Sequence, residues 1–337
     1  MQQALSLAQR GQFTALPNPM VGCILVKEGK IVGQGFHEKP GTAHAETHAL
    51  REAGSNAKGA SVYINLEPCC HFGRTPPCVD ALIQAGIAEV FIAMEDPNPL
   101  IRGKSIEKLK ACGIRVHLGL LNAEAQTLNR IFFHYITTQT PYVIGKWAMS
   151  LDGKMAVNPG DDPVLSSPES FKDLHELRQR TPGILIGSQT ALHDNPSLTV
   201  RLGEIHRQPQ RIVLNTRADL PRTLALFDGT LPGKTWLICA EDTHPDFPAE
   251  TTEIIPCKTK NGKIDLPSLM QILAEREIAA ILVEGGRTLL NTFFQENLVN
   301  EVITYITPWI IADLPHKLRV QGLNDILLRG TCLPYQK

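Results

Sequence analysis

Two short stretches of this chain combine residue types that can hold a metal ion. The first, TAHAETHAL (42–50), contains a His-x-Glu pair, and the second, EPCCHFGRTPPC (67–78), contains a Glu-Pro-Cys triplet and a later cysteine. One histidine and two cysteines are the ligands with which zinc deaminases hold a single Zn²⁺. The pattern therefore predicts a zinc site formed by His44, Cys69 and Cys78.

The chemistry expected of such a site is hydrolytic. Three protein ligands leave the fourth tetrahedral position of zinc for a water molecule, whose pKa the metal lowers toward neutrality. Glu46 follows the histidine by two residues and is suited to carry a proton from that water to departing ammonia. We therefore predict that Glu46 is the catalytic residue of a deaminase.

The cysteine pattern leaves alternatives for the ligand set. Cys69 is preferred to Cys70 because it directly follows the Glu-Pro pair, and eight residues separate it from Cys78. A closed structural zinc site could instead use Cys69, Cys78 and either Cys70 or His71, or the thiols could simply be buried. His48 lies one helical turn after His44, so the two histidines resemble a pair of metal ligands on one helix face. We do not expect His48 to be a ligand.

Length and composition limit the class of protein. The 337 residues suffice for two domains, and a hydrophobic content of 43% with 20% charged residues is typical of globular chains. The sequence lacks an apolar run long enough for a membrane span and a secretory signal at residues 1–13, so we expect a cytoplasmic protein. With 33 Lys and Arg against 34 Asp and Glu, it lacks the basic footprint of a nucleic-acid-binding protein, which favours a small-molecule substrate.

Hydrophobic periodicity predicts strands that alternate with helices along both halves of the chain, which is typical of α/β layered folds. Strands are expected at residues 21–26, 30–36, 61–66, 90–94, 114–119, 142–149, 183–188, 211–216, 235–240, 279–286 and 301–311, and helices at 3–10, 43–53, 78–86, 106–113, 122–134, 168–180, 267–276 and 287–296. The polar stretch TTQTPY (137–142) reads as a linker, so we expect two domains, 1–139 and 140–337.

With these motifs in place, the sequence resembles the RibD family of bifunctional riboflavin-biosynthesis enzymes. The resemblance extends over roughly residues 1–300 and includes LAQRG (7–11), PNPMVGC (17–23), HAE (44–46), LEPCCHFGRTPPC (66–78), DPNP (96–99), KWAMSLDGK (146–154), LHELR (174–178), GSQTALHDNPSLTVR (187–201) and LVEGGRTL (282–289). It implies an α/β protein with an N-terminal cytidine-deaminase-like three-layer domain and a C-terminal dihydrofolate-reductase-like domain.

For the first domain, the resemblance implies zinc-dependent hydrolytic deamination of 2,5-diamino-6-ribosylamino-4(3H)-pyrimidinone 5′-phosphate. Carried over by position, the residues that line the pocket of this phosphorylated pyrimidine are Asn18, His37, Arg74, Asp96 and Asn98. Amides and carboxylates suit the pyrimidine edge and the sugar, and the arginine suits the phosphate.

For the second domain, the resemblance implies reduction of the ribosyl group to a ribityl chain by NADPH, although no GxGxxG motif follows a strand here. The cofactor-binding residues carried over are Ala148, Thr190, Asp194, Gly286, Arg287, Thr288, Leu289, Leu290, Asn291 and Thr292. Those expected to contact the reductase substrate are Lys146, Asp162, Arg178, Leu198, Arg201 and Glu284.

The chain departs from the family pattern after the SLDGK motif. DDPVLSS (161–167) places Asp162 where the family has a neutral hydroxyl and Val164 where it has an aromatic residue. One alternative is therefore a deaminase whose reductase-like domain is catalytically impaired. A nucleic-acid-editing deaminase and a structural zinc module are further alternatives, the first disfavoured by the neutral charge. We also expect a homo-oligomer.

Overall fold

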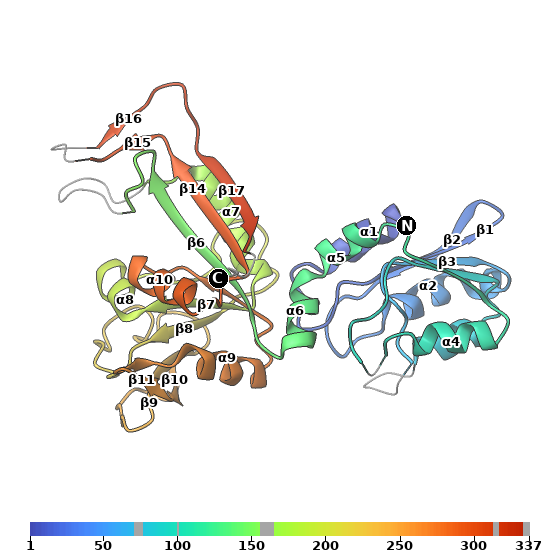
Figure 1. Ribbon diagram of the computed structural model, residues 1–337, viewed down its shortest axis with the longest axis horizontal. Helices are drawn as coiled ribbons and strands as arrows, with labels where there is room; N and C mark the ends of the chain where they lie inside the picture. Colours follow the sequence, from blue (N-terminus) through green and yellow to red (C-terminus); the bar gives the residue numbers. More distant parts are fainter. Residues whose placement is uncertain (71–76, 100, 156–164, 313–316, 333–337) are drawn as a thin grey trace. The chain divides into compact units, whose positions relative to one another are not determined.

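The computed structural model describes residues 1–70, 77–99, 101–155, 165–312 and 317–332. The chain forms two compact units, Met1–Gln139 and Thr140–Lys337 (Figure 1). Within the described ranges, none of the helices has the length and hydrophobicity that a membrane span requires. Both units are built from strands and helices that alternate along the chain, so the predicted α/β class is confirmed for each.

The first unit contains a five-stranded sheet in the order β2-β1-β3-β4-β5. Strand β1 is antiparallel to both of its neighbours, whereas β3, β4 and β5 are parallel. The strands are β1 (Gly22–Lys27), β2 (Lys30–Phe36), β3 (Ser61–Ile64), β4 (Glu89–Ile92) and β5 (Arg115–Leu118). Because parallel strands end at the same edge of the sheet, the segments that follow β3 and β4 lie next to each other.

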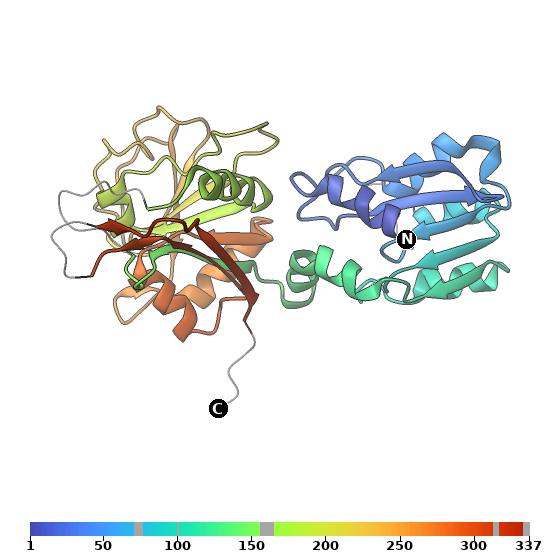
Figure 2. The ribbon, with the colours of Figure 1, turned by 90° about the horizontal axis from the view of Figure 1, so that it is seen from above.

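Helices cover both faces of this sheet and give three layers (Figures 1 and 2). On one face, α2 (Ala45–Ala53), α3 (Cys78–Gln84) and α4 (Lys104–Ala111) bury alanine and leucine side chains against the aliphatic residues of β1, β3 and β4. On the other, α1 (Gln2–Ala8) packs against Gly22, and side chains of α5 (Asn122–Leu128) and α6 (Arg130–Thr138) share a smaller core with Leu5.

Helix α2 approaches strand β2 unusually closely because two glycines face it. A Cβ atom on Gly35 would lie 2.5 Å from the carbonyl oxygen of Ala45 and 2.5 Å from Cβ of His48. Gly33 meets the backbone of the same helix one turn further on, at Ala49. The position of the start of α2, which carries the predicted metal ligand, is therefore set by backbone packing against β2.

The second unit contains an eight-stranded sheet in the order β10-β9-β8-β7-β13-β6-β14-β17. Every neighbouring pair is parallel except β14 and β17. The strands are β6 (Tyr142–Ser150), β7 (Gly183–Gly187), β8 (Gln210–Leu214), β9 (Thr235–Ala240), β10 (Thr252–Cys257), β13 (Ala280–Val283), β14 (Glu301–Thr307) and β17 (Ile326–Thr331). The chain order reverses between β7 and β13, which makes the carboxyl ends of these strands the expected ligand site of an open parallel sheet.

The large core of the second unit lies under α9 (Leu266–Glu275) and α10 (Arg287–Gln295), whose leucines and Phe293 pack on one face of the sheet. Helix α7 (Pro168–Arg180) lies on the opposite face of the sheet. There the carboxylate of Asp173 accepts a hydrogen bond from the hydroxyl group of Tyr305 on β14. Short elements complete the unit: α8 (Ser188–Asp194) and the two-residue strands β11 (Thr259–Lys260), β12 (Lys263–Ile264), β15 (Trp309–Ile310) and β16 (Leu318–Arg319).

Several predicted elements were wrong in extent. The helix expected at 122–134 is two helices, α5 and α6, which meet at Asn129, and α6 continues into the expected linker as far as Thr138. The strand expected at 301–311 ends at Thr307, because Pro308 follows and cannot donate to the ladder. The sequence analysis also missed β10, α8 and β17.

Candidate functional site

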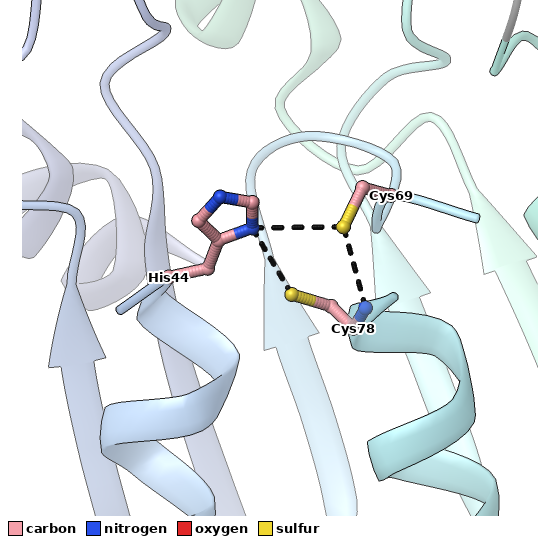
Figure 3. Close-up of side chains that lie close together, drawn as sticks. All are labelled: His44, Cys69 and Cys78. Carbon is pink, nitrogen blue, oxygen red and sulfur yellow. Dashed lines mark hydrogen bonds between the residues drawn. The ribbon is translucent and has the colours of Figure 1, made fainter. Parts of the chain in front are cut away.

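Three side chains converge at one end of the first unit's sheet, as Figure 3 shows: His44, Cys69 and Cys78. Nδ1 of His44 lies 3.2 Å from Sγ of Cys78 and 3.6 Å from Sγ of Cys69, and the backbone N–H of Cys78 donates to Sγ of Cys69 over 3.3 Å. Their ligand atoms all lie within 4.8 Å of one another. The sequence-predicted ligand set is thus brought together by the fold.

Each ligand is positioned by the end of a regular element. His44 is the N-cap residue of α2, with an extended backbone that turns its ring away from the helix. Cys69 lies in the segment that follows β3, and Cys78 is the first residue of α3. The backbone N–H of Val79 donates to the carbonyl of Cys69 over 3.1 Å, so the two thiols are held together by the start of α3.

The spacing of the three donors fits a zinc ion. Zn–S bonds of about 2.3 Å and Zn–N bonds of about 2.0 Å at tetrahedral angles place nitrogen and sulfur roughly 3.5 Å apart, close to the observed separations from His44 to the two thiols. Among the described residues, the cluster contains neither Cys70 nor His48. The other alternative ligand, His71, lies outside the described residues. Three protein donors are typical of a catalytic zinc site.

The electrostatics of the cluster favour an ionised thiol. Hydrogen bonds from the side chain of Cys78 and from His44 lower the pKa of the Cys69 thiol well below its usual value. Burial raises the pKa of Glu46 to about 7, and the negative charge of Cys69 adds to this effect. Glu46 is 3% exposed and stands on the first turn of α2, beside the cluster. A carboxyl group with a pKa near neutrality is suited to exchange protons at physiological pH.

Of the predicted pyrimidine-binding residues, His37 lies beside a metal ligand with Asn18 bonded to it, and Asp96 and Asn98 lie in the segment that follows β4. Nδ2 of Asn18 lies 3.0 Å from Nε2 of His37, and the ring of His37 contacts that of His44 edge to face at 5.4 Å. Asp96 is buried after β4, and its carboxylate accepts the backbone N–H of Asn98 over 2.8 Å. Burial raises the pKa of Asp96 to about 6. The remaining predicted residue, Arg74, lies outside the described residues.

Two asparagines that the sequence analysis missed anchor the loop that carries Asn18. The side chain of Asn65 accepts the N–H of Gly22 and donates to the carbonyl of Met20, and the side chain of Asn129 exchanges two further hydrogen bonds with Met20. Their sequence contexts gave no signal of this role, because the partners lie 43 to 109 residues away.

In the second unit, a pocket of ≈ 790 Å³ opens at the carboxyl ends of β7 and β13, where the strand order reverses. Of the residues predicted to bind cofactor or reductase substrate, those lining it are Lys146, Ala148, Thr190, Asp194, Glu284, Gly286 and Arg287. The backbone N–H of Gly286, the N-cap of α10, donates to Oγ1 of Thr190 on α8 over 3.2 Å. This contact joins two residues that line the pocket, and residues 286–288 at the N-terminus of α10 are exposed, so that an anion could bind there.

A buried charge network forms the pocket's inner end. The pKa of Glu284 lies below its usual value because the charge and hydrogen bonds of Arg178 outweigh the effect of burial. Burial lowers the pKa of Lys146, an effect that the charge of Glu284 opposes. The ammonium of Lys146 lies 5.3 Å from the ring centroid of Tyr305, which also lines the pocket and which the sequence analysis missed.

Other predicted residues that the structure describes in the second unit are not among those that line the pocket. Leu290 and Leu289 pack into the core beneath α10, and Thr288, Asn291 and Thr292 follow the same helix, with Thr288 and Asn291 exposed. Leu198 is 2% exposed. Arg201 is exposed, donates its backbone N–H to His175 and contacts Ser197 with its guanidinium. Asp162 and Val164 lie outside the described residues.

Comparison with known proteins agrees with both halves of this description. Residues 1–94 match the family model described as "Cytidine and deoxycytidylate deaminase zinc-binding region", and residues 141–328 match the "RibD C-terminal domain". The chain is 42% identical to the riboflavin biosynthesis protein RibD of Escherichia coli (strain K12), over 93% of this chain and 88% of that protein. The corresponding protein of Aquifex aeolicus (strain VF5) is also 42% identical, over 93% of this chain and 87% of its own length.

Solved structures show the same arrangement of elements. The diaminohydroxyphosphoribosylaminopyrimidine deaminase/5-amino-6-(5-phosphoribosylamino)uracil reductase of Thermotoga maritima is 31% identical with a TM-score of 0.85, and the match covers 98% of this chain and 96% of that one. Acinetobacter baumannii RibD is 34% identical with a TM-score of 0.83, covering 97% and 96%.

Fold and matches together define a bifunctional enzyme, with a zinc-binding deaminase domain followed by a reductase domain. Zinc and NADPH are the cofactors of these two domains. More particularly, the chain belongs to the family of riboflavin biosynthesis protein RibD.

Proposed function

We propose that this chain carries out two consecutive steps on one phosphorylated pyrimidine. In the first, residues 1–139 remove the 2-amino group of 2,5-diamino-6-ribosylamino-4(3H)-pyrimidinone 5′-phosphate by hydrolysis. In the second, residues 140–337 reduce the ribosyl group of the deaminated product to a ribityl chain. The activities named for the Thermotoga maritima relative, whose structure superimposes over 98% of this chain, support both steps.

In the deaminase half, His44, Cys69 and Cys78 would hold the zinc ion, which when bound supplies Lewis acidity for activation of water. The observation that carries this assignment is the convergence of these three donors beside the buried carboxyl group of Glu46. Glu46 would take a proton from the attacking water and deliver it to the departing amino group.

The substrate-binding roles in this half follow from the same geometry. Asn18 and His37, which are bonded to each other, would bind one edge of the pyrimidine next to the metal ligands. Asp96 and Asn98, which lie in the loop after β4, would bind polar groups of the substrate. The two residues are held in one hydrogen-bonded turn. Amides and carboxylates of this kind orient a polar ligand rather than provide apolar contact.

In the reductase half, the pocket at the carboxyl ends of β7 and β13 would hold NADPH, which when bound supplies a hydride. The open N-terminus of α10, with Gly286 and Arg287 at the rim, suits the cofactor's phosphates. Lys146 and Glu284 at the inner end would bind and orient the sugar, with Arg178 holding Glu284 in place. Asp162, Leu198 and Arg201 stay predicted substrate residues.

The deciding experiment supplies purified protein with 5-amino-6-ribosylaminouracil 5′-phosphate and NADPH and follows loss of the reduced-nicotinamide absorbance, with Arg201→Ala for comparison. We expect substrate-dependent oxidation that the variant loses. A folded protein that deaminates the diaminopyrimidinone yet oxidises no NADPH would instead be a deaminase with an impaired reductase domain, the alternative raised by Asp162 and Val164.

The substrate is a small molecule, and we propose that nucleic acid is not a partner. The nearly balanced charge, with formal net charge −1, supports this. The cytoplasmic location and the homo-oligomeric state stay predictions.

A further inference from the structure

Glu67, the first residue of the EPCC stretch, has no part in the chemistry described so far, yet its carboxylate is fully engaged. Oε1 accepts hydrogen bonds from Oγ of Ser105 over 2.6 Å and from its backbone N–H over 3.2 Å. Oε2 accepts the backbone N–H groups of Gly103 over 2.9 Å and of Asp96 over 3.2 Å. The residue is 3% exposed, and four donors match the acceptor capacity of an ionised carboxylate.

The four donors belong to one segment of the chain. It begins at Asp96 after β4 and ends in the first turn of α4 at Ser105, so it contains both proposed substrate residues, Asp96 and Asn98. The backbone N–H of Glu67 also donates to the carbonyl of Met94, at the start of the same connection. One side chain therefore ties both ends of this segment to the end of β3.

Glu67 is separated from the proposed zinc ligand Cys69 by a single proline. Proline has a fixed φ and few accessible conformations, so the link between the carboxylate clamp and the thiol is short and stiff. The hydrogen bonds of Glu67 to Asp96, Gly103 and Ser105 therefore connect this segment to the stretch of chain that carries the thiol. A displacement of about 1 Å in such a link is enough to weaken substrate alignment.

We propose that Glu67 is a positioning residue that fixes Asp96 and Asn98, and hence the substrate they bind, at the correct distance from the metal ligand Cys69. The inference rests on the proposed deaminase function and adds to it a residue that touches neither metal nor substrate. It predicts that weakening the clamp lowers affinity for the pyrimidine while leaving metal binding intact.

The test replaces Glu67 by glutamine in the full chain. The amide NH₂ cannot accept the backbone N–H groups that the lost oxygen accepted, so the clamp is broken at one side while the size of the side chain is kept. We expect KM for the diaminopyrimidinone phosphate to rise about tenfold or more while kcat changes less than about threefold. Zinc should stay at one ion per chain, and NADPH oxidation with the deaminated substrate should equal that of the parent.

Two further variants make the test specific. Ser105→Ala removes one of the four donors and should raise KM by about threefold, which decides the question if Glu67→Gln does not fold. Glu107 lies on the exposed face of α4 and serves as the control, so Glu107→Gln should leave both KM and kcat unchanged.

Unchanged KM in a folded Glu67→Gln protein, or loss of zinc from it, would overturn the positioning role. If Glu67→Gln does not fold, an unchanged KM in Ser105→Ala would do the same. A parent protein that fails to deaminate the pyrimidine would overturn the proposed function itself, and this role with it.

Discussion

The guanidinium of Arg178 donates two hydrogen bonds to the carboxylate of Glu284, over 2.8 and 2.9 Å, across 106 residues of sequence. Both side chains are 9% exposed, and a third bond from Arg178 reaches the carbonyl oxygen of Thr199. The pair joins α7 to the end of β13 at the inner end of the reductase pocket. A buried bidentate pair of this kind fixes geometry, and its value becomes visible when one partner is removed.

Arg178→Ala should lower the free energy of unfolding of the second unit by about 3–5 kcal/mol, because Glu284 would stay buried without the two hydrogen bonds of its guanidinium partner. Arg180→Ala on the same helix, where the ion pair to Glu176 is exposed, should cost less than about 1 kcal/mol. All three tryptophans lie beyond residue 140, so denaturation followed by tryptophan fluorescence reports on this unit. Equal effects of the two variants would contradict the prediction.

Glu46→Gln should reduce the kcat of deamination by about 10²–10⁴, since the glutamine cannot exchange the proton. Zinc content and NADPH oxidation should not change, because Glu46 is not among the metal-binding donors and lies in the other unit. Glu52→Gln, at an exposed position of the same helix, serves as the control. A Glu46→Gln protein that deaminates within about tenfold of the parent would show that another group moves the proton.

Cys69→Ser should weaken zinc binding by more than about 100-fold, because even changes in residues behind a metal ligand cost roughly 10–100-fold. Cys70→Ser, one position further on and outside the cluster, should keep the metal. Competition with a chromophoric chelator measures both. Retained zinc in Cys69→Ser, with loss in Cys70→Ser, would reverse the assignment of the ligand.

Acid should destabilise the second unit through His175, which is buried and accepts the N–H of Arg201. Burial and the charges of Arg178 and Arg201 lower its pKa to about 4, against about 6.5 in the unfolded chain. Above about pH 6.5 the imidazole of His175 is neutral in both the folded and the unfolded protein. Below that pH only the unfolded protein gains the proton, so this contribution to the stability of the folded protein is lost as the pH falls from about 6.5 to about 4.

At about pH 5.5 this difference amounts to roughly 1 kcal/mol. His175→Asn keeps a hydrogen-bond acceptor but cannot titrate, so its unfolding free energy should fall less between about pH 7 and about pH 5.5. Urea denaturation at the two pH values measures the difference. Parallel losses in parent and variant would assign the acid sensitivity to other groups.

Gly35→Ala should displace α2 and with it His44, which is the N-cap residue of that helix. The added Cβ would overlap the carbonyl oxygen of Ala45, at a cost of about 1–3 kcal/mol and with reduced zinc affinity. Gly330→Ala, where the nearest atom would be Cγ2 of Val302 at 4.0 Å, should leave zinc affinity unaltered. Thermal unfolding and chelator competition together test this, and unchanged values for Gly35→Ala would show that α2 can shift without consequence.

The helix predicted at 122–134 illustrates where the sequence was insufficient. Its apolar pattern continues through Asn129, but the amide of Asn129 bonds to Met20 and the backbone there leaves helical geometry. Strand β17 was missed for a similar reason. All of its residues are exposed, so it does not alternate between a buried and an exposed face. Local patterns describe periodicity, whereas these features depend on partners distant in the chain.

The sequence by itself determined the α/β class, the family and the residue types able to bind zinc and move protons, because these are carried by short motifs such as HAE and EPC. Only the tertiary structure decided that Glu67 clamps the 96–105 segment, that Tyr305 lines the reductase pocket and that Arg178 holds Glu284. These contacts depend on the order and register of the strands, which set the neighbours of each side chain across distances that no local pattern records.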